Sequence, residues 1–150
     1  MDQVYELETS LLLKYPWQAR NDYVDVILDP SEKERKKFLS KHLKKPASAE
    51  EEKKLWDLLE AEKFSLFMYT SCGWFFDEIS GIEPVQVMKF ALRAMELVQP
   101  YYKRDIEGQF LKILRQAKSN IPEQGTGEDV FNNLVKPAKN VKEKVSLNNQ

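Results

Sequence analysis

The apolar positions of the chain recur at intervals of three and four residues over most of its length. This spacing places them on one face of an α-helix, whereas a half-buried strand alternates every second residue. The longest stripe runs through residues 55–68, and another runs through residues 87–98. We therefore predict an all-α fold, an irregular helical bundle in which two long helices flank a turn at residues 71–81.

Prolines and capping signals predict where the helices begin and end. A short first helix at residues 4–12 stops before Pro16, because the residue preceding a proline is disfavoured in helical conformation. Ser31 and Ser48 are each followed three residues later by a Glu, which indicates a capping box at the start of two more helices. Residues 19–28 are rich in Val and Ile, so a strand remains an alternative to a second helix there. Further helices are predicted at residues 83–98, 106–117 and 126–135.

The chain length suits one domain with a core of its own. We expect residues 1–138 to form this helical domain. Residues 139–150 are mostly polar, and we expect them to form a frayed tail.

Composition and charge exclude several classes of protein. Hydrophobic residues make up 42% and charged residues 31%, as in a soluble globular protein, and no apolar stretch is long enough for a membrane span. The net charge of -1 provides no field that attracts nucleic acid or an anionic membrane. The single cysteine, Cys72, and the absence of a signal-peptide pattern suit a reducing compartment. We expect a cytoplasmic protein with no nucleic-acid or membrane partner.

Residue chemistry suggests neither a catalytic pair nor a metal centre. Cys72 and His42 are single and distant in sequence, which is not the spacing of metal ligands. Nothing in the sequence brings the His42 imidazole to the Cys72 thiol, as a nucleophile and its base require. We therefore expect no metal, no cofactor and no catalytic Cys-His pair in this chain.

The segment with the densest chemistry lies at residues 71–81, where Trp74, Phe75 and Phe76 precede Asp77 and Glu78. Aromatic faces stack on sugar rings while nearby carboxylates accept hydrogen bonds from hydroxyls, so one interpretation is a carbohydrate contact. The other is that the rings fill the gap where two long helices diverge. The two acids are adjacent and do not share a helical face, which favours a capping or turn role over an acid/base pair.

Residues 69–83 and 85–87 resemble the helical region that follows the catalytic barrel in glycoside hydrolase family 57-like proteins, a region of unknown function. Two shorter blocks, residues 16–23 and 119–123, resemble the same region in the same order. The resemblance implies retaining enzymes that act on α-glucans, with a catalytic Glu and Asp on an incomplete (β/α) barrel. This chain shows no alternation of strands and helices. We expect an accessory segment that is not catalytic alone and whose partners are the barrel, in cis or in trans, and an α-glucan.

The last motif of that family, Ser-Ser-Asp-Trp, helps to form the substrate cleft, and residues 71–74 are similar to it. The resemblance implies that Ser71 and Trp74 contact substrate. Gly73 stands at the acidic position of the motif, and Asp77 is a candidate substitute for the missing carboxylate. A free-standing helical module that binds another protein remains the alternative function.

Overall fold

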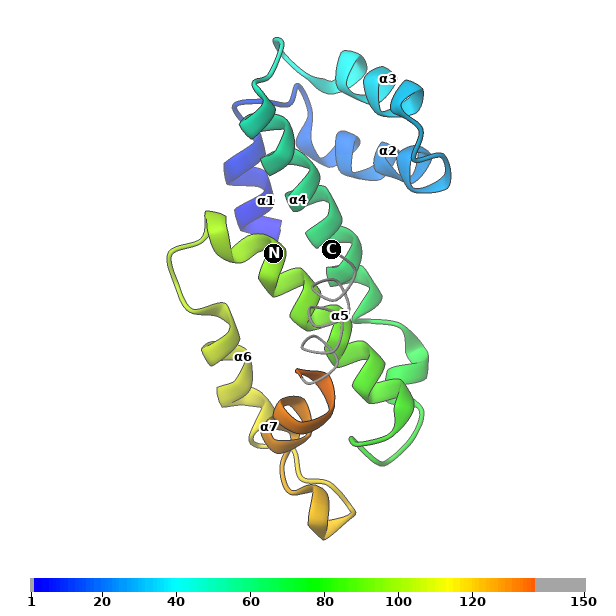
Figure 1. Ribbon diagram of the computed structural model, residues 1–150, viewed down its shortest axis with the longest axis vertical. Coiled ribbons are helices and arrows are strands. Elements are labelled where there is room, and N and C mark those ends of the chain that lie inside the picture. The colour runs from blue at the N-terminus through cyan, green and yellow to red at the C-terminus, as the bar shows by residue number, and fades with distance from the viewer. Residues whose placement is uncertain (1, 137–150) are drawn as a thin grey trace, which may run out of the picture.

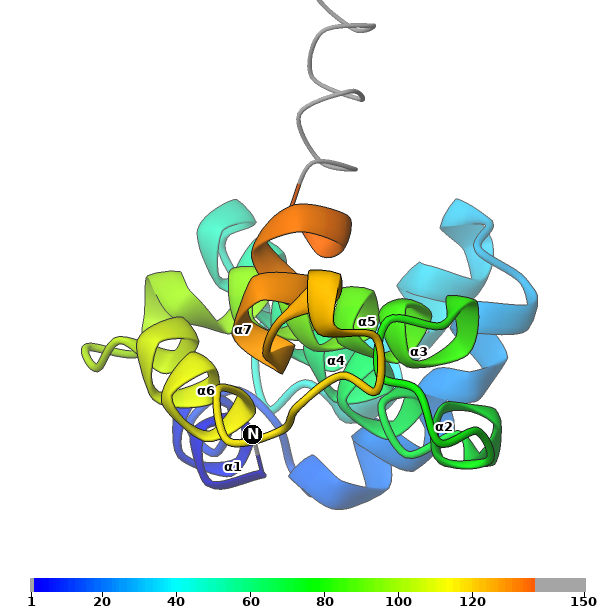
Figure 2. The same cartoon turned by 90° about the horizontal axis from the view of Figure 1, so that it is seen from below.

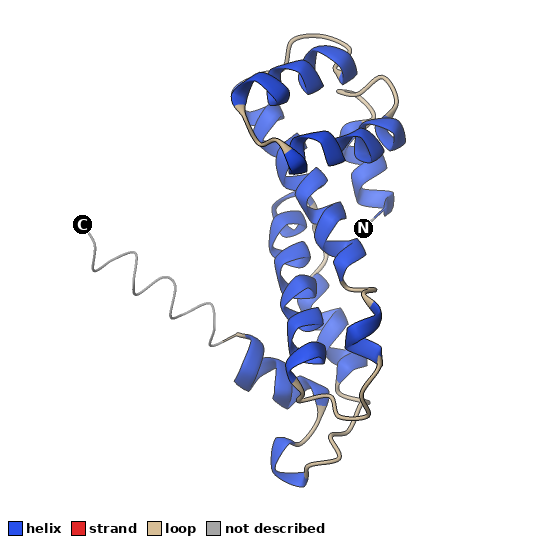
Figure 3. Cartoon of the chain, turned by 90° about the vertical axis from the view of Figure 1, so that its right-hand side faces the viewer, coloured by secondary structure: helices blue, strands red, loops and turns tan. Residues whose placement is uncertain are grey.

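The protein is all-α in the computed structural model, which describes residues 2–136. Its α-helices are α1 (Asp2–Thr9), α2 (Pro16–Leu28), α3 (Glu32–His42), α4 (Ala49–Phe67), α5 (Ile82–Val98), α6 (Ile106–Leu114) and α7 (Gly127–Val130) (Figure 1). The connections include the 3-10 turns η1 (Ser71–Trp74), η2 (Gln99–Tyr101) and η3 (Pro122–Gln124), and the π-helical turn η4 (Phe131–Val135) follows α7. Figure 3 shows helices and loops throughout the described part, which confirms the predicted fold class. The predicted tail at residues 139–150 lies outside the described residues.

Helices α4 and α5 are the two longest, and they run in opposite directions (Figure 1). They pack together because each buries an apolar stripe, with Leu55, Leu58 and Leu59 on α4 and Ala91 and Ala94 among those on α5. The remaining helices surround this pair (Figure 2). The connection between α4 and α5, predicted as a turn, is therefore held at one end of an elongated molecule (Figures 1 and 3).

The core consists of two clusters of buried side chains at different places along α5. The first joins α1–α4 to the C-terminal end of α5 and includes Tyr5, Phe38 and Leu97. The second packs the middle and N-terminal part of α5 against α7 and η4, and it includes Met88 and Phe131. Because α5 contributes to both clusters, it ties the two ends of the molecule together.

The helix starts follow the predicted capping chemistry. The Ser48 hydroxyl accepts a hydrogen bond from the Glu51 backbone N–H at 3.2 Å, and the Glu51 carboxylate accepts one from the Ser48 N–H at 2.7 Å, which completes the capping box of α4. At α3 the Ser31 hydroxyl accepts from the Glu34 N–H at 3.3 Å, but the Ser31 N–H donates to the Asp29 carboxylate at 3.0 Å and not to Glu34. The capping box predicted at α3 is therefore only half formed. Residues 19–28 lie within α2, so the strand alternative is wrong. Ala19 and Val26 are two helical turns apart and lie on the same buried face of α2.

Within residues 2–136, no helix combines the length and the apolar character that crossing a membrane requires.

Candidate functional site

The segment between α4 and α5 is an exposed turn, which we call the aromatic turn (residues 69–82). It begins after α4 ends at Phe67, where the Thr70 hydroxyl donates a hydrogen bond to the Phe67 carbonyl at 2.9 Å. The Gly73 N–H then donates to the Thr70 carbonyl at 3.2 Å at the start of η1. Local hydrogen bonds therefore shape the backbone that carries the aromatic side chains.

The three consecutive aromatic side chains of this turn lie on the surface. Trp74 is 70% exposed, Phe75 82% and Phe76 54%. The Phe75 and Phe76 rings contact each other edge to face, with centroids 5.2 Å apart. The interpretation of these rings as a plug between the long helices is wrong, because side chains that fill such a gap would be buried.

Further exposed apolar side chains lie close to these rings in sequence, at the ends of α4 and α5. Phe67 is exposed at the end of α4, Tyr69 follows it, and Ile82 is 85% exposed at the start of α5. We call the six exposed residues the aromatic patch, which comprises Phe67, Tyr69, Trp74, Phe75, Phe76 and Ile82. Exposed apolar side chains concentrated in this way are typical of a binding surface.

Gly73 brings η1 into close contact with α5. A Cβ atom added to Gly73 would collide with the Val87 side chain and lie 3.1 Å from its Cβ. An acidic side chain, as in the motif that residues 71–74 resemble, would not fit here without movement of the turn or of Val87. The glycine is thus required by packing, and the turn lacks a carboxylate at this position.

The Glu78 carboxylate fixes the second half of the turn. It accepts hydrogen bonds from the Ser80 N–H at 2.8 Å, the Ser119 hydroxyl at 2.6 Å and the Asn120 N–H at 2.7 Å. These donors, the Ser119 hydroxyl foremost, lower the pKa of Glu78 to about 2, because hydrogen bonds to the charged form favour it. The Asn120 side-chain amide also donates to the Asp77 carbonyl. Residues distant in sequence therefore hold the turn in one shape.

The structure places all three predicted site residues on this turn. Ser71 and Trp74 are exposed in the same turn of 3-10 helix, and Asp77 is exposed three residues further along the chain. The carboxylate with the hydrogen-bonding role is Glu78 rather than Asp77. Its partners Ser119 and Asn120 were not predicted as contacts of the turn, although they begin one of the blocks that carry the resemblance.

Cys72 and His42 belong to different parts of the molecule. Cys72 is exposed in η1, and its thiol lies 3.6 Å from the Thr70 hydroxyl. His42 is buried at the end of α3 against the Phe38 ring, with its Nε2 3.1 Å from an Asp22 oxygen. Burial lowers the pKa of His42 despite the opposing effect of the Asp22 carboxylate. The imidazole thus has a structural environment and does not meet the thiol.

A groove on the opposite side of α4 and α5 from α3 is the second candidate site, and sequence reasoning missed it. It has a volume of about 850 Å³ and is lined by residues of α1, α4, α5 and α6 and by Arg20 of α2. Glu62 of α4 is buried beside it, with Oε2 3.6 Å from the Arg20 Nε. Burial first, and the Asp2 charge second, raise the pKa of Glu62.

Among residues 2–136, no group of three or more His, Cys, Asp and Glu side chains is placed to hold a metal ion.

The fold and the two sites define a helical protein with an exposed aromatic turn and a groove that adjoins it at Tyr69. The chain belongs to the family described as Domain of unknown function (DUF3536), whose model matches residues 1–149. No curated protein and no solved structure matches the chain. The aromatic turn and its surroundings are therefore the features of this chain that bear on its function.

Proposed function

We propose that this chain is a helical accessory segment of a glycoside hydrolase family 57-like, α-glucan-acting enzyme. In this proposal it docks on a catalytic (β/α) barrel, in cis or in trans, and supplies one wall of the glucan cleft through the aromatic turn. The observation that carries the proposal is the exposure of Trp74, at 70%, on a turn whose shape Glu78 fixes. A flat, exposed aromatic face offers a sugar ring a stacking surface.

A further observation that supports the proposal is a contact of Glu78 with another segment of the chain. The central block of the resemblance contains Glu78, and a second block starts at Ser119, 41 residues later in the chain. The hydrogen bond between these two side chains joins the blocks at the aromatic turn. A cleft wall needs segments that together shape one exposed surface.

We propose that catalysis itself resides on the barrel. A general acid must carry a proton at the working pH, whereas the low pKa of Glu78 keeps it ionised at neutral pH. Both of its oxygens also accept hydrogen bonds within the chain. Asp77 is adjacent to it and exposed, and we assign Asp77 at most a substrate contact. An exposed free thiol at Cys72 suits a cytoplasmic location for the whole assembly.

The aromatic patch also supports a second candidate, a free-standing module that binds another protein. Protein interfaces are enriched in Trp, Tyr and Phe, and the patch combines all three types. The two candidates differ in what Trp74 contacts, which is a sugar ring in one and an apolar protein surface in the other.

Amylose titration monitored by tryptophan fluorescence tests the glucan contact. We expect amylose to change the emission of the wild-type chain, alone or joined to its barrel, because Trp74 is the most exposed of the tryptophans among the described residues. Trp74→Ala should abolish the change. Tyr15→Ala is the matched control, since Tyr15 is 69% exposed but precedes α2 at the other end of the molecule (Figure 1).

A flat response of the wild-type chain joined to the barrel would contradict the glucan contact. If the same chain bound a protein other than the barrel, and Trp74→Ala removed that binding, the interaction module would be favoured instead. In the chain alone, a change that persists in Trp74→Ala would assign the signal to Trp17 or Trp56 and would also contradict the proposal.

A further inference from the structure

The groove between α1, α4, α5 and α6 reaches the start of the aromatic turn, where Tyr69 lines it, but most of its lining comes from other parts of the chain. Its volume of about 850 Å³ lies in the range of about 300–1,000 Å³ that is usual for ligand pockets. The floor is apolar and includes Met68, Ala91 and Met95. Polar side chains stand around this floor, which is the arrangement that orients a bound molecule.

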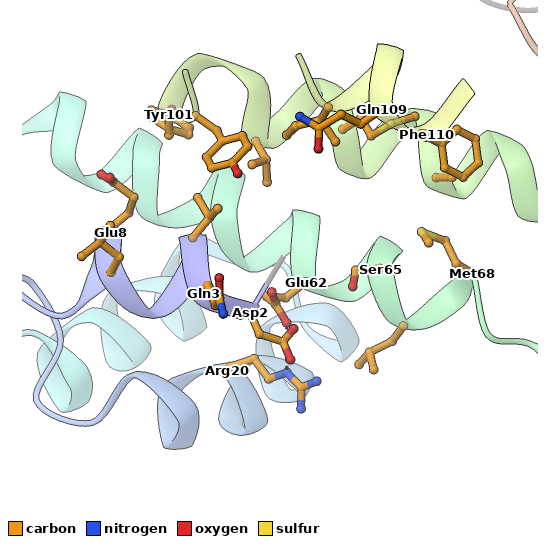
Figure 4. Close-up of a pocket in the computed structure, with 18 of the residues that line it drawn as sticks. Asp2, Gln3, Glu8, Arg20, Glu62, Ser65, Met68, Tyr101, Gln109 and Phe110 are labelled. Carbon is orange, nitrogen blue, oxygen red and sulfur yellow. Dashed lines mark ion pairs between the residues drawn. The ribbon is translucent and has the colours of Figure 1, made fainter. Parts of the chain in front are cut away.

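One side of the groove carries charges of both signs. Figure 4 shows Asp2, Glu62 and Arg20 close together there, with the ion pair of Arg20 and Glu62 drawn. The Glu8 carboxylate, further along the groove, is already paired with Lys54. The Glu62 carboxylate thus lies between the Arg20 guanidinium and a second carboxylate, Asp2. The groove therefore has no strong preference for an anion or a cation.

The other side carries the exposed Gln109 amide and two aromatic rings that contacts within the fold hold in position. Gln109 and Phe110 of α6 lie across the groove from Glu62 and Ser65 (Figure 4). The Phe110 ring packs edge to face on Phe131 in the core, with centroids 5.7 Å apart. At the far end the Tyr101 hydroxyl is held by a hydrogen bond of 2.7 Å to Asp57. These rings are pre-positioned, so they lose little freedom when a ligand binds.

We propose that this groove binds a neutral, hydroxyl-rich ligand, a short oligosaccharide. An anion would face the carboxylates of Asp2 and Glu62, and a cation would face the Arg20 guanidinium. A purely apolar ligand would leave polar groups such as Gln109 without hydrogen-bond partners, which costs free energy. Hydroxyl groups both donate and accept, so they match a lining of carboxylates, amides and a guanidinium, while a sugar face packs on a ring such as Phe110.

The choice of a glucan probe rests on the proposed function, and the groove would be a second glucan contact besides the aromatic turn. The test titrates maltohexaose into the isotope-labelled full chain and follows backbone amide signals by NMR. We expect the signals of residues around Ser65 and Gln109 to shift. Gln109→Ala should weaken this binding by about 2- to 10-fold, the effect of one lost hydrogen bond.

Gln116→Ala is the matched control, since this exposed glutamine follows α6 and does not line the groove. Gln116→Ala should leave the affinity of the groove for maltohexaose unchanged. Trp74→Ala should also leave it unchanged if the groove binds independently of the aromatic turn. No shift at the groove, or equal affinity in Gln109→Ala, would overturn the inference. Tighter binding of spermine or of inorganic phosphate at the same signals would overturn it as well. Loss of glucan binding in Trp74→Ala alone would leave the proposed function in place and remove only the groove.

Discussion

At the residue scale, Glu78 decides the shape of the aromatic turn. Its carboxylate accepts hydrogen bonds from two residues of a loop far along the chain, Ser119 and Asn120, and from Ser80 within the turn. The folded-state pKa of about 2 is lower than the ordinary value of 4.5. The stabilisation by the ionised group is therefore complete above the ordinary value and is lost as the pH falls through the folded-state pKa.

The variant Glu78→Gln tests this linkage. The amide accepts fewer and weaker hydrogen bonds than the carboxylate, so the variant should be less stable than the wild type at neutral pH, and the difference should shrink as the pH falls toward about 2. Denaturant unfolding at a series of pH values, followed by circular dichroism, measures both trends. In hydrogen exchange, the Asn120 amide should also lose protection. A constant difference in stability across the pH range would contradict the assigned role.

Single residues also show where sequence reasoning stopped. Glu62 follows Leu55, Leu58 and Leu59 at seven, four and three residues, so the helical period itself placed this acid on the buried face. The helical spacing thus predicts a buried Glu62, whereas the charge of its side chain predicts an exposed one. The Asp2 and Arg20 side chains beside it come from other helices, and no pattern within α4 indicates them.

At the scale of elements, the helices were predictable and their mutual contacts were not. Capping residues and apolar stripes depend on neighbours within one or two turns, which is why the starts of α3 and α4 were correct. The aromatic turn is exposed because of the way the segment between α4 and α5 runs relative to this helix pair. The local sequence does not determine that path. The close approach of Gly73 to Val87 is likewise a contact between elements.

The variant Gly73→Ala tests the packing of η1 on α5. The added methyl group should collide with Val87 and destabilise the fold by about 1–3 kcal/mol, as overpacking does. In a Val87→Ala background the space exists, and the same substitution should cost no more than about 0.5 kcal/mol. Urea unfolding of the four proteins of this double-mutant cycle gives the interaction energy. Equal costs in both backgrounds would show that η1 and α5 do not pack in this way.

At the scale of the whole molecule, the α4–α5 pair carries the aromatic turn to one end of an elongated domain (Figures 1 and 3). The core clusters lie along α5, so the domain supports the exposed turn without burying it. A domain built in this way suits a surface that is completed by a larger partner, and we propose the catalytic barrel as that partner. Leu28, exposed at the end of α2, offers a control surface away from the turn.

The most direct measurement is the rate of amylose conversion by the catalytic barrel that the proposal requires, with the chain added in increasing amounts. The proposal predicts that the wild-type chain and Leu28→Ala raise the rate in a saturable way. Trp74→Ala should reach saturation at a similar amount of protein but raise the rate less, because in the proposal Trp74 stacks on the glucan and does not anchor the chain to the barrel. A barrel whose rate is unchanged by the wild-type chain, and which does not bind it, would contradict the proposed role.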